Sequence, residues 1–334
     1  MGSYARACRA EIEAASLPAA TSVFFGGGTP SLLPPSLLTS ILAAIEIVDG
    51  AEVTVECNPD TVTSELLDAY LAGGVNRLSF GVQSMALHVL SGLGRTHRPG
   101  TVSDAVNLAR RAGFDRYNLD LIYGGAGETD ADWEETLSAV LGLDASHVSA
   151  YALTVEPGTP LAADPDRHPD DDVQAERYLI ADAVLGEAGL RNYEISNWAV
   201  PGHECRHNLL YWSQGDYRGI GCAAHSHQAG RRWWNVRTPE RYIGLIEEGR
   251  SAEGGSETLD PAARAMEGLQ LAVRTQAGVP SAVFPPADLA TLVERRLIVT
   301  DGERAILTPV GRLLANEVAL RITLVEAAGG SPCR

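Results

Sequence analysis

The sequence contains few cysteines, and their spacing shows no framework of disulfides. Its five cysteines are an odd number, they are widely spread, and no two of them form a Cys-x-x-Cys pair. We therefore expect five reduced thiols: Cys8, Cys57, Cys205, Cys222 and Cys333. This spacing argues against a small secreted domain that is held together by disulfide bonds.

The chain also lacks an excess of basic residues and a long apolar run. Its 26 basic and 43 acidic residues give a formal charge of −17, so the phosphate neutralisation that drives nucleic-acid binding is not expected. No apolar run approaches the roughly eighteen residues that span a bilayer, and the N-terminal stretch has acidic residues and no apolar signal core. We therefore expect a cytoplasmic protein with no nucleic-acid partner and no membrane span.

An alternation of two patterns fills residues 22–200. Short runs rich in β-branched or aromatic residues alternate with Ala- and Leu-rich stretches of helical period. The runs are SVFF, EVTVE, NRLSFGVQ, RYNLDLIYG, HVSAYALTVE and RNYEISNWA. Strands that alternate with helices predict an α/β fold with parallel pairing, right-handed crossovers and helices outside the sheet.

The alternation ends near residue 200. The segments ECRHNLLYW, GIGCAAHSH and RRWWNV are typical of short strands and turns, and a later helical stretch precedes a hairpin with a tight turn at Asp301-Gly302. This helix and hairpin predict a small winged-helix-like module. We therefore expect a β/α domain over 1–200, an extension over 201–250, and the C-terminal module and tail over 251–334.

Polar residues close several of the apolar strands. Glu56 ends VTVE, Gln83 ends LSFGV, Asp120 interrupts NLDLIYG, and Gly26–Thr29 follow VFF. In a parallel β/α barrel the functional sites lie at the carboxyl ends of the strands, so these residues predict a binding edge. Bare glycines let the backbone approach a ligand closely. The alternative is that the residues cap strands or satisfy buried polar groups, and that the glycines form a tight turn without a ligand.

A second group of candidate residues lies after the β/α repeats. His203, Cys205 and His207 would face one side of an extended segment, and His225 and His227 would do the same further on. With Cys222 as another soft ligand, this pattern is compatible with zinc, although its spacings match no common zinc module. The alternative is a set of histidines that only form structural hydrogen bonds.

Several of these segments occur in an order that resembles one known family. The motifs are VFFGGGTPSLL, VECNP, RLSFGVQS, LGRTH, NLDLIYG, SAYALTVEPGTPL, YEISNWA and ECRHNLLYW. They resemble the HemW haem chaperones, relatives of the oxygen-independent coproporphyrinogen III oxidase in the radical S-adenosylmethionine superfamily. The resemblance covers nearly the whole chain from about Tyr4. It implies a partial (β/α)6 TIM-like barrel that lacks its first strand, followed by the winged-helix-like module.

The resemblance also implies two sets of binding residues. The positions that match the S-adenosylmethionine site of the family are Gly27, Gly28, Thr29, Glu56, Gln83, Arg95, Asp120 and Thr154. A His-Asn-x-x-Tyr-Trp motif is associated with haem in the family, and here it comprises His207, Asn208, Tyr211 and Trp212. It implies His207 as the axial ligand of the haem iron, with Tyr211 and Trp212 packed on the macrocycle.

The iron–sulfur ligands of the family have no match in this chain. The resemblance implies a first strand and a Cys-x3-Cys-x2-Cys loop that together hold a [4Fe–4S] cluster, but Cys8 stands alone in the segment that would follow this loop. We expect that the chain as given cannot assemble the cluster. Either the true start lies upstream of Met1 or the protein is a shortened paralogue, and the missing strand favours the first explanation because its loss would expose a sheet edge.

The resemblance implies a protein that binds haem and transfers it to a recipient protein, which could be membrane-associated, and that has an S-adenosylmethionine pocket. One alternative is a radical enzyme like coproporphyrinogen III oxidase, an oxidoreductase activity that we do not expect from the chain as given. The other is a regulator that binds S-adenosylmethionine without a cluster.

Overall fold

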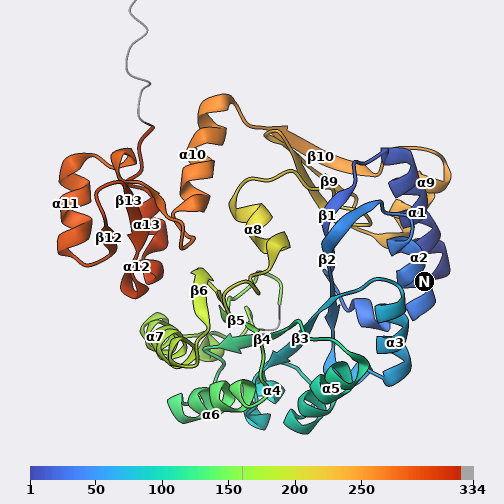
Figure 1. Ribbon diagram of the computed structural model, residues 1–334, viewed down its shortest axis with the longest axis horizontal. Coiled ribbons are helices and arrows are strands. Elements are labelled where there is room, and N and C mark those ends of the chain that lie inside the picture. The colour runs from blue at the N-terminus through green and yellow to red at the C-terminus, as the bar shows by residue number, and fades with distance from the viewer. Residues whose placement is uncertain (160, 325–334) are drawn as a thin grey trace, which may run out of the picture.

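The largest element of the structure is a seven-stranded sheet that curls into part of a barrel (Figure 1). This computed structural model describes residues 1–159 and 161–324, so the predicted thiol Cys333 lies outside the described residues. The strand order is β1-β2-β3-β4-β5-β7-β6. The strands are β1 (Ala20–Phe25), β2 (Ile47–Cys57), β3 (Arg77–Gln83), β4 (Tyr117–Tyr123), β5 (His147–Ala152), β6 (Arg191–Glu194) and β7 (Asn197–Ala199).

Strands β1 to β5 pair in parallel, which confirms the α/β prediction for the first five runs. The sixth run instead forms β6 and β7, which pair antiparallel with each other, and β7 pairs antiparallel with β5. Parallel pairing was therefore the wrong prediction for this run. The chain turns back within two residues, Ile195 and Ser196, and such a turn allows only antiparallel pairing.

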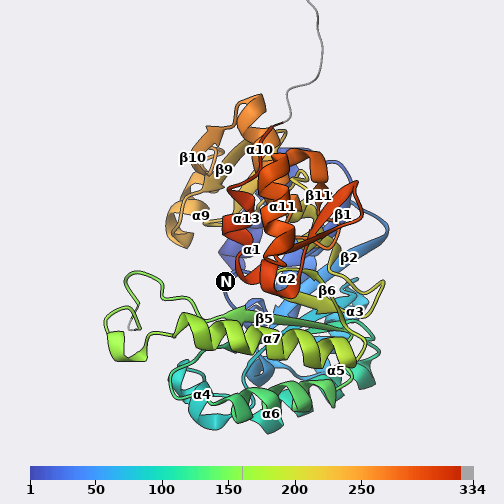
Figure 2. The same ribbon diagram turned by 90° about the vertical axis from the view of Figure 1, so that its left-hand side faces the viewer.

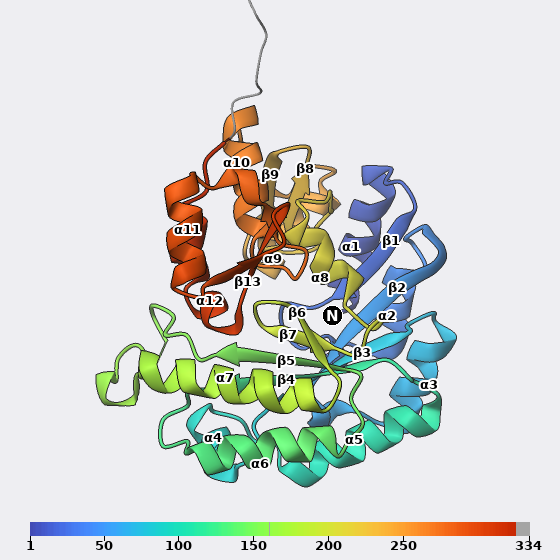
Figure 3. The same cartoon turned by 60° about the vertical axis from the view of Figure 1, so that its left-hand side comes forward.

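Helices cover the outer face of the curved sheet, whereas its inner side faces helix α8 (Arg206–Trp212) (Figures 1 and 3). The sheet and its helices share one core, in which Leu78, Leu119 and Trp133 are fully buried. Continuous apolar runs suit parallel strands because both faces of the sheet are covered. The connecting helices are α2 (Pro35–Leu42), α3 (Ser64–Ala72), α4 (Leu87–Gly92), α5 (Pro99–Ala112), α6 (Asp130–Leu141) and α7 (Asp171–Glu187), with short 3₁₀ turns at Pro30–Leu32, Pro59–Thr61 and Pro165–Arg167.

A second, antiparallel sheet lies against the first helix, α1 (Gly2–Ala15). The carboxylate of Glu11 in α1 accepts hydrogen bonds from the backbone of Gly221 at 3.0 Å and from Asn235 at 2.9 Å. This sheet includes β10 and therefore extends over residues 225–258. The predicted division of the chain at residues 200 and 250 stays a prediction. Its elements are β8 (His225–Gln228), β9 (Arg231–Asn235) and β10 (Glu253–Thr258), with α9 (Pro239–Glu247) between the last two strands.

The C-terminal module has its own core and lies beside α7 (Figure 2). Its β12 and β13 pair antiparallel, which confirms the predicted hairpin at Asp301-Gly302. Arg312 joins the module to α7 through an ion pair with Asp182 at 2.7 Å. The elements are α10 (Pro261–Ala272), β11 (Val279–Pro280), a 3₁₀ turn (Ser281–Val283), α11 (Pro286–Glu294), β12 (Ile298–Thr300), β13 (Arg304–Leu307), α12 (Pro309–Leu313) and α13 (Ala315–Ala319).

Within residues 1–159 and 161–324, no helix combines the length and the apolar composition that a membrane crossing requires.

Candidate functional site

The carboxyl ends of β1 to β4 bring the predicted ligand-binding residues to one edge of the sheet. Gly26–Thr29 follow β1, Glu56 lies one residue before the end of β2, Gln83 ends β3, and Asp120 lies within β4. Because these strands are parallel, their carboxyl ends share an edge. The backbone N–H of Gly27 donates a hydrogen bond to Oε2 of Glu56 at 3.2 Å, so the glycine turn and the second strand meet directly.

Two carboxyl groups at this edge are poorly solvated. Burial raises the pKa of Glu56 to about 7, and the neighbouring Asp120 adds to this increase. Burial also raises the pKa of Asp120, although hydrogen bonds from Ser79 and Asn118, both 2.7 Å long, favour its charged form. Two such neighbouring carboxyl groups favour either a bound proton or a ligand that carries positive charge.

The glycine turn is sterically required next to these carboxyl groups. A Cβ atom at Gly26 would lie 2.6 Å from the Phe24 ring and 3.0 Å from the carboxyl group of Glu56. Gly27 has a φ of +94°, which glycine adopts without strain. A Cβ atom at Gly28 would meet nothing within 4 Å. The first two glycines are therefore needed by the fold, whereas the space beside Gly28 is open to a ligand.

The other predicted residues of this set differ in their surroundings. Gln83 is buried and has a φ of 66°, a conformation that is uncommon for residues with a side chain. Arg95, in the loop after α4, and Thr154, just after β5, are both exposed. The hydroxyl of Thr154 donates to the carbonyl of Ala152 at 3.4 Å, and among the described residues the side chain of Arg95 forms no hydrogen bond. The role of this whole set stays a prediction.

Helix α8 carries the second predicted site and is held by a buried carboxylate. Oε1 of Glu52 accepts from the backbone N–H of His207 at 3.1 Å, and Oε2 accepts from that of Arg206 at 3.3 Å. A seven-residue helix is not stable alone, so these contacts define where it begins. The extended conformation predicted for this segment is therefore wrong, because a residue about 150 positions earlier supplies acceptors for the first turn.

The ring of His207 is fixed on both of its nitrogen atoms. It stacks on Phe24 with 5.3 Å between ring centroids and an interplanar angle of 17°. Its Nδ1 lies 2.9 Å from the hydroxyl of Ser22, and its Nε2 lies 2.8 Å from the hydroxyl of Tyr211. The imidazole therefore has one orientation relative to β1.

The electrostatic surroundings of His207 favour the neutral imidazole. Burial lowers its pKa, the charge of Glu52 opposes this effect, and the charge of Arg77 adds to it. The neutral ring is the form that binds a metal ion through nitrogen. The imidazole is therefore in the form that could bind an iron atom once one of its nitrogen atoms is released from its hydrogen bond.

The two aromatic residues of the motif, Tyr211 and Trp212, are the last two residues of helix α8. Tyr211 is 42% exposed, and its ring contacts those of His207 and Tyr217 edge-on, at centroid distances of 4.9 and 4.6 Å. The indole Nε1 of Trp212 is buried and has no hydrogen-bond partner within the described residues. A buried donor without a partner is costly, so a ligand acceptor near Trp212 would be stabilised.

The proposed zinc ligands do not converge. In the described part of the chain, no three His, Cys, Asp or Glu side chains form a group that could hold a metal ion. The thiol of Cys205 donates to Glu52 at 3.4 Å, and Nδ1 of the buried His227 lies 3.0 Å from the carbonyl oxygen of Gly215. The zinc interpretation therefore has no support among these residues, and the histidine hydrogen bonds match the structural alternative.

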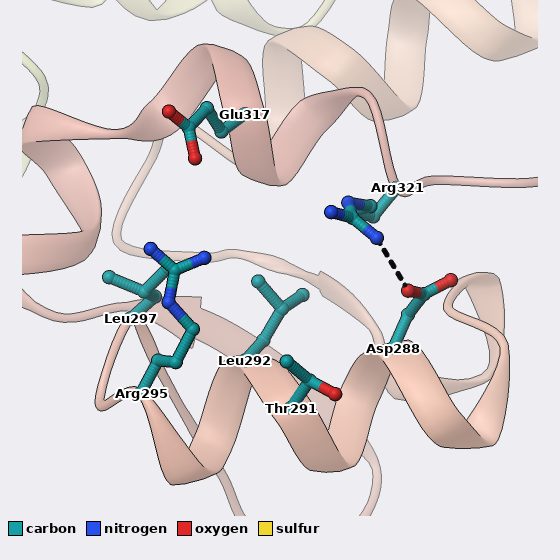
Figure 4. Close-up of a pocket in the computed structure, with 7 residues that line it drawn as sticks. All are labelled: Asp288, Thr291, Leu292, Arg295, Leu297, Glu317 and Arg321. Atoms are coloured by element: carbon teal, nitrogen blue, oxygen red, sulfur yellow. Dashed lines mark hydrogen bonds and ion pairs between the residues drawn. The ribbon is translucent and has the colours of Figure 1, made fainter.

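Two cavities lie away from these residues. One, of about 20 Å³, lies in the C-terminal module near the ion pair of Asp288 with Arg321 at 2.9 Å (Figure 4). It has room for about one water molecule. The other, of about 200 Å³, lies between the turn Gly124–Glu128 and the start of α7. Both are smaller than the pockets of about 300–1,000 Å³ that enclose typical organic ligands.

Sequence reasoning missed three residues that build the α8 site. These are Glu52, Ser22 and Phe24. Glu52 accepts a hydrogen bond from the backbone of His207, Ser22 forms a hydrogen bond with its Nδ1 atom, and Phe24 stacks on its ring. Glu52 had a detectable signal, because a charged residue inside an apolar strand is rarely buried without a partner. Ser22 and Phe24 had none, since their contacts depend on how α8 returns to β1.

The fold and the carboxyl-edge residues together define the class of the protein. Residues 5–140 match the radical SAM superfamily. The solved structure of coproporphyrinogen III oxidase (HemN) from Escherichia coli matches 95% of this chain, and 82% of that chain, with a TM-score of 0.81 at 23% sequence identity. The protein thus has the fold of a radical SAM protein.

The curated relatives are more specific. The chain is 42% identical to the haem chaperone HemW of Mycobacterium tuberculosis strain H37Rv, over 93% of this chain and 84% of the relative. It is 36% identical to HemW of Bacillus subtilis strain 168, over 90% of this chain and 85% of the relative. The chain belongs to the HemW family.

Proposed function

We propose that this protein binds haem at helix α8 and passes it to a recipient protein. The observation that carries the proposal is the half-buried, neutral imidazole of His207, fixed by Ser22 and Phe24 beside the exposed ring of Tyr211. Family membership supports it, because the relatives named above are haem chaperones. Cytoplasmic localisation and a soluble or membrane-associated recipient are part of the same proposal.

The contacts of His207 suggest how the iron would be approached. If Nδ1 donates its hydrogen to the Ser22 hydroxyl, the lone pair of Nε2 remains available. Tyr211 must then release Nε2, which its exposed position allows. The macrocycle would pack against the rings of Tyr211 and Trp212, and the unpaired Nε1 of Trp212 could donate to a polar group of the ligand.

The first test is the substitution His207→Ala. We expect the affinity for haem to fall by about tenfold or more, equivalent to at least about 1.4 kcal/mol, with a changed Soret band, because the nitrogen atom that would bind the iron is lost. Absorbance titration with haem measures both effects. The matched control is His225→Ala, which removes an exposed histidine from β8 and should leave the affinity unchanged. An unchanged Soret band and affinity in His207→Ala would refute the assignment.

We further propose that the carboxyl edge of the sheet binds S-adenosylmethionine. Gly27, Gly28 and Thr29 would offer the glycine turn to the methionyl part, and the carboxylates of Glu56 and Asp120 would accept hydrogen bonds from the cationic and hydroxyl groups of the ligand. Support comes from the raised pKa values of both carboxyl groups and the open space beside Gly28. The resemblance to the family implies that the site also includes Gln83, Arg95 and Thr154.

Gly28→Ala tests this pocket without disturbing the fold. Because a Cβ atom at Gly28 meets nothing within 4 Å, we expect an unchanged free energy of unfolding. The added methyl group should nevertheless lower the affinity for S-adenosylmethionine by about tenfold, because the ligand can no longer approach the backbone closely. Equilibrium dialysis without added iron measures the affinity, and Gly186→Ala in α7, also free of contacts within 4 Å, is the control. Equal affinities for both variants would contradict the pocket.

A [4Fe–4S] cluster does not fit the described residues. It needs several thiolates at one place, whereas no three potential ligands converge in this part of the chain. Burial also disfavours the thiolate forms by raising the pKa of Cys8 to about 11, of Cys57 to about 12 and of Cys205 to about 11. No radical step is therefore part of the proposal, and conversion of coproporphyrinogen III to vinyl products by this chain would contradict it.

A further inference from the structure

A chain of buried polar side chains crosses the inner side of the sheet and joins the carboxyl edge to helix α8. Asn118 Nδ2 lies 2.7 Å from Oδ1 of Asp120, and Asn118 Oδ1 lies 2.6 Å from Nδ1 of His147. Nε2 of His147 lies 2.8 Å from the hydroxyl of Tyr193, which is 3.3 Å from Nδ2 of Asn208. Three of these residues, Asn118, His147 and Tyr193, are almost completely buried.

The donors of this chain all point in the same direction. Asn118 Oδ1 can only accept, so Nδ1 of His147 carries the hydrogen. Burial holds the pKa of His147 well below its ordinary value, so the ring is neutral and Nε2 accepts from the hydroxyl of Tyr193. The oxygen of Tyr193 then accepts from Asn208. Because hydrogen bonds in series polarise one another, the chain is stronger than separate pairs and ends on Asp120.

A bulge in β6 gives the side chain of Asn208 a second hydrogen-bond partner on that strand. The pairing of β6 with β7 shifts between Asn192 and Glu194, and a bulge alters which side its residues face. Asn208 Nδ2 accordingly also donates to Oε1 of Glu194 at 3.3 Å. Glu194 is buried and bonded to Asn197. Asn208 is thus held by two successive residues of one strand, in addition to the hold of Glu52 on the first turn of α8.

We propose that Asn208 and Tyr193 are positioning residues that attach helix α8 to this chain of hydrogen bonds. The orientation of His207 then depends on the charge and the hydrogen bonding of Asp120. The structural attachment stands on the contacts alone, while its meaning for haem rests on the proposed function. Any group that changes the charge or hydrogen bonding of Asp120 then changes the affinity at α8, and the effect is reciprocal.

The attachment is tested by Tyr193→Phe with Tyr70→Phe as the matched control. Both remove one buried hydroxyl, but that of Tyr70 has no partner among the described residues, whereas that of Tyr193 joins His147 to Asn208. Hydrogen exchange of the full chain is measured by mass spectrometry over α8 and, as an internal reference, over β3. In Tyr193→Phe we expect α8 to exchange about tenfold faster with β3 unchanged, and in Tyr70→Phe neither to change.

The transmission from Asp120 is tested by a double-mutant cycle. Asp120→Asn removes the charge at the end of the chain and should accelerate exchange over α8 by about threefold in the wild-type background, but not in Tyr193→Phe. Equal exchange over α8 in Tyr193→Phe and wild type, or an equal rise over α8 and β3, overturns the attachment. An effect of Asp120→Asn that persists in Tyr193→Phe overturns the transmission. Haem titration of the wild-type chain separately decides the proposed function.

Discussion

Glu52→Ala should lower the free energy of unfolding by about 3–5 kcal/mol and free the start of helix α8. The carboxylate is fully buried and lies 3.7 Å from a guanidinium nitrogen of Arg116. It also accepts from the backbone of Arg206 at 3.3 Å, from that of His207 at 3.1 Å and from the thiol of Cys205 at 3.4 Å. Removal leaves these donors, of which the thiol is buried and the two backbone N–H groups are partly buried, without their acceptor. Urea denaturation measures the loss.

Asp49→Ala is the control for Glu52→Ala, because Asp49 is an exposed acid on the same strand and should change stability by less than about 0.5 kcal/mol. Glu52→Gln keeps one oxygen acceptor, so its loss of stability should lie between the losses of Glu52→Ala and Asp49→Ala. The affinity for haem should decrease in Glu52→Ala as in His207→Ala, since the imidazole loses its fixed position. A stability loss below about 1 kcal/mol would mean that α8 is held by other contacts.

The parallel part of the fold was predictable because the sequence repeats it. Five β-type runs separated by helical stretches can pair only through crossovers, and the parallel order of β1 to β5 follows. That order also explains why Glu56 and the glycine turn were predicted to share an edge, where Gly27 now contacts Glu56. The antiparallel hairpin after residue 190 was not predictable in the same way, because its two-residue turn, Ile195-Ser196, lacks the usual glycine or asparagine.

Helix α8 and its polar surroundings were not predictable from local pattern. Seven residues are too few for a helical period to be distinguished from a strand, and the carboxylate that starts the helix belongs to β2. The chain through His147 is also hidden in the sequence, since its members come from four separate elements. Long-range contacts of this kind can be seen only when the strands have been assembled.

Stability should decrease as pH rises through the range in which Glu56 titrates. Its pKa is about 7 in the folded protein against an ordinary value of 4.5, so the folded state binds the proton more tightly than the unfolded state. The stabilisation is fully present below pH 4.5 and is lost as pH approaches 7. At about 1.4 kcal/mol per pKa unit, the loss from this group amounts to about 3 kcal/mol.

Glu56→Gln isolates this effect, because its amide stays neutral at every pH. The difference in the free energy of unfolding between Glu56→Gln and wild type should grow by about 3 kcal/mol from about pH 4.5 to about pH 8. The exposed Glu134→Gln in α6 should show no such trend. A flat difference for Glu56→Gln would mean that this carboxyl group is well solvated.

A positively charged ligand should reverse the cost of ionising Glu56. The sulfonium and ammonium groups of S-adenosylmethionine favour the carboxylate form, so saturating ligand should flatten the pH dependence of the wild-type chain more than that of Glu56→Gln, in which Asp120 is the remaining carboxyl group of the pair. An uncharged analogue of the same shape should bind without this flattening. The edge of the sheet is least stable at neutral pH, because its carboxyl groups are then ionised and unpaired. A cationic ligand should therefore raise the free energy of unfolding most at neutral pH.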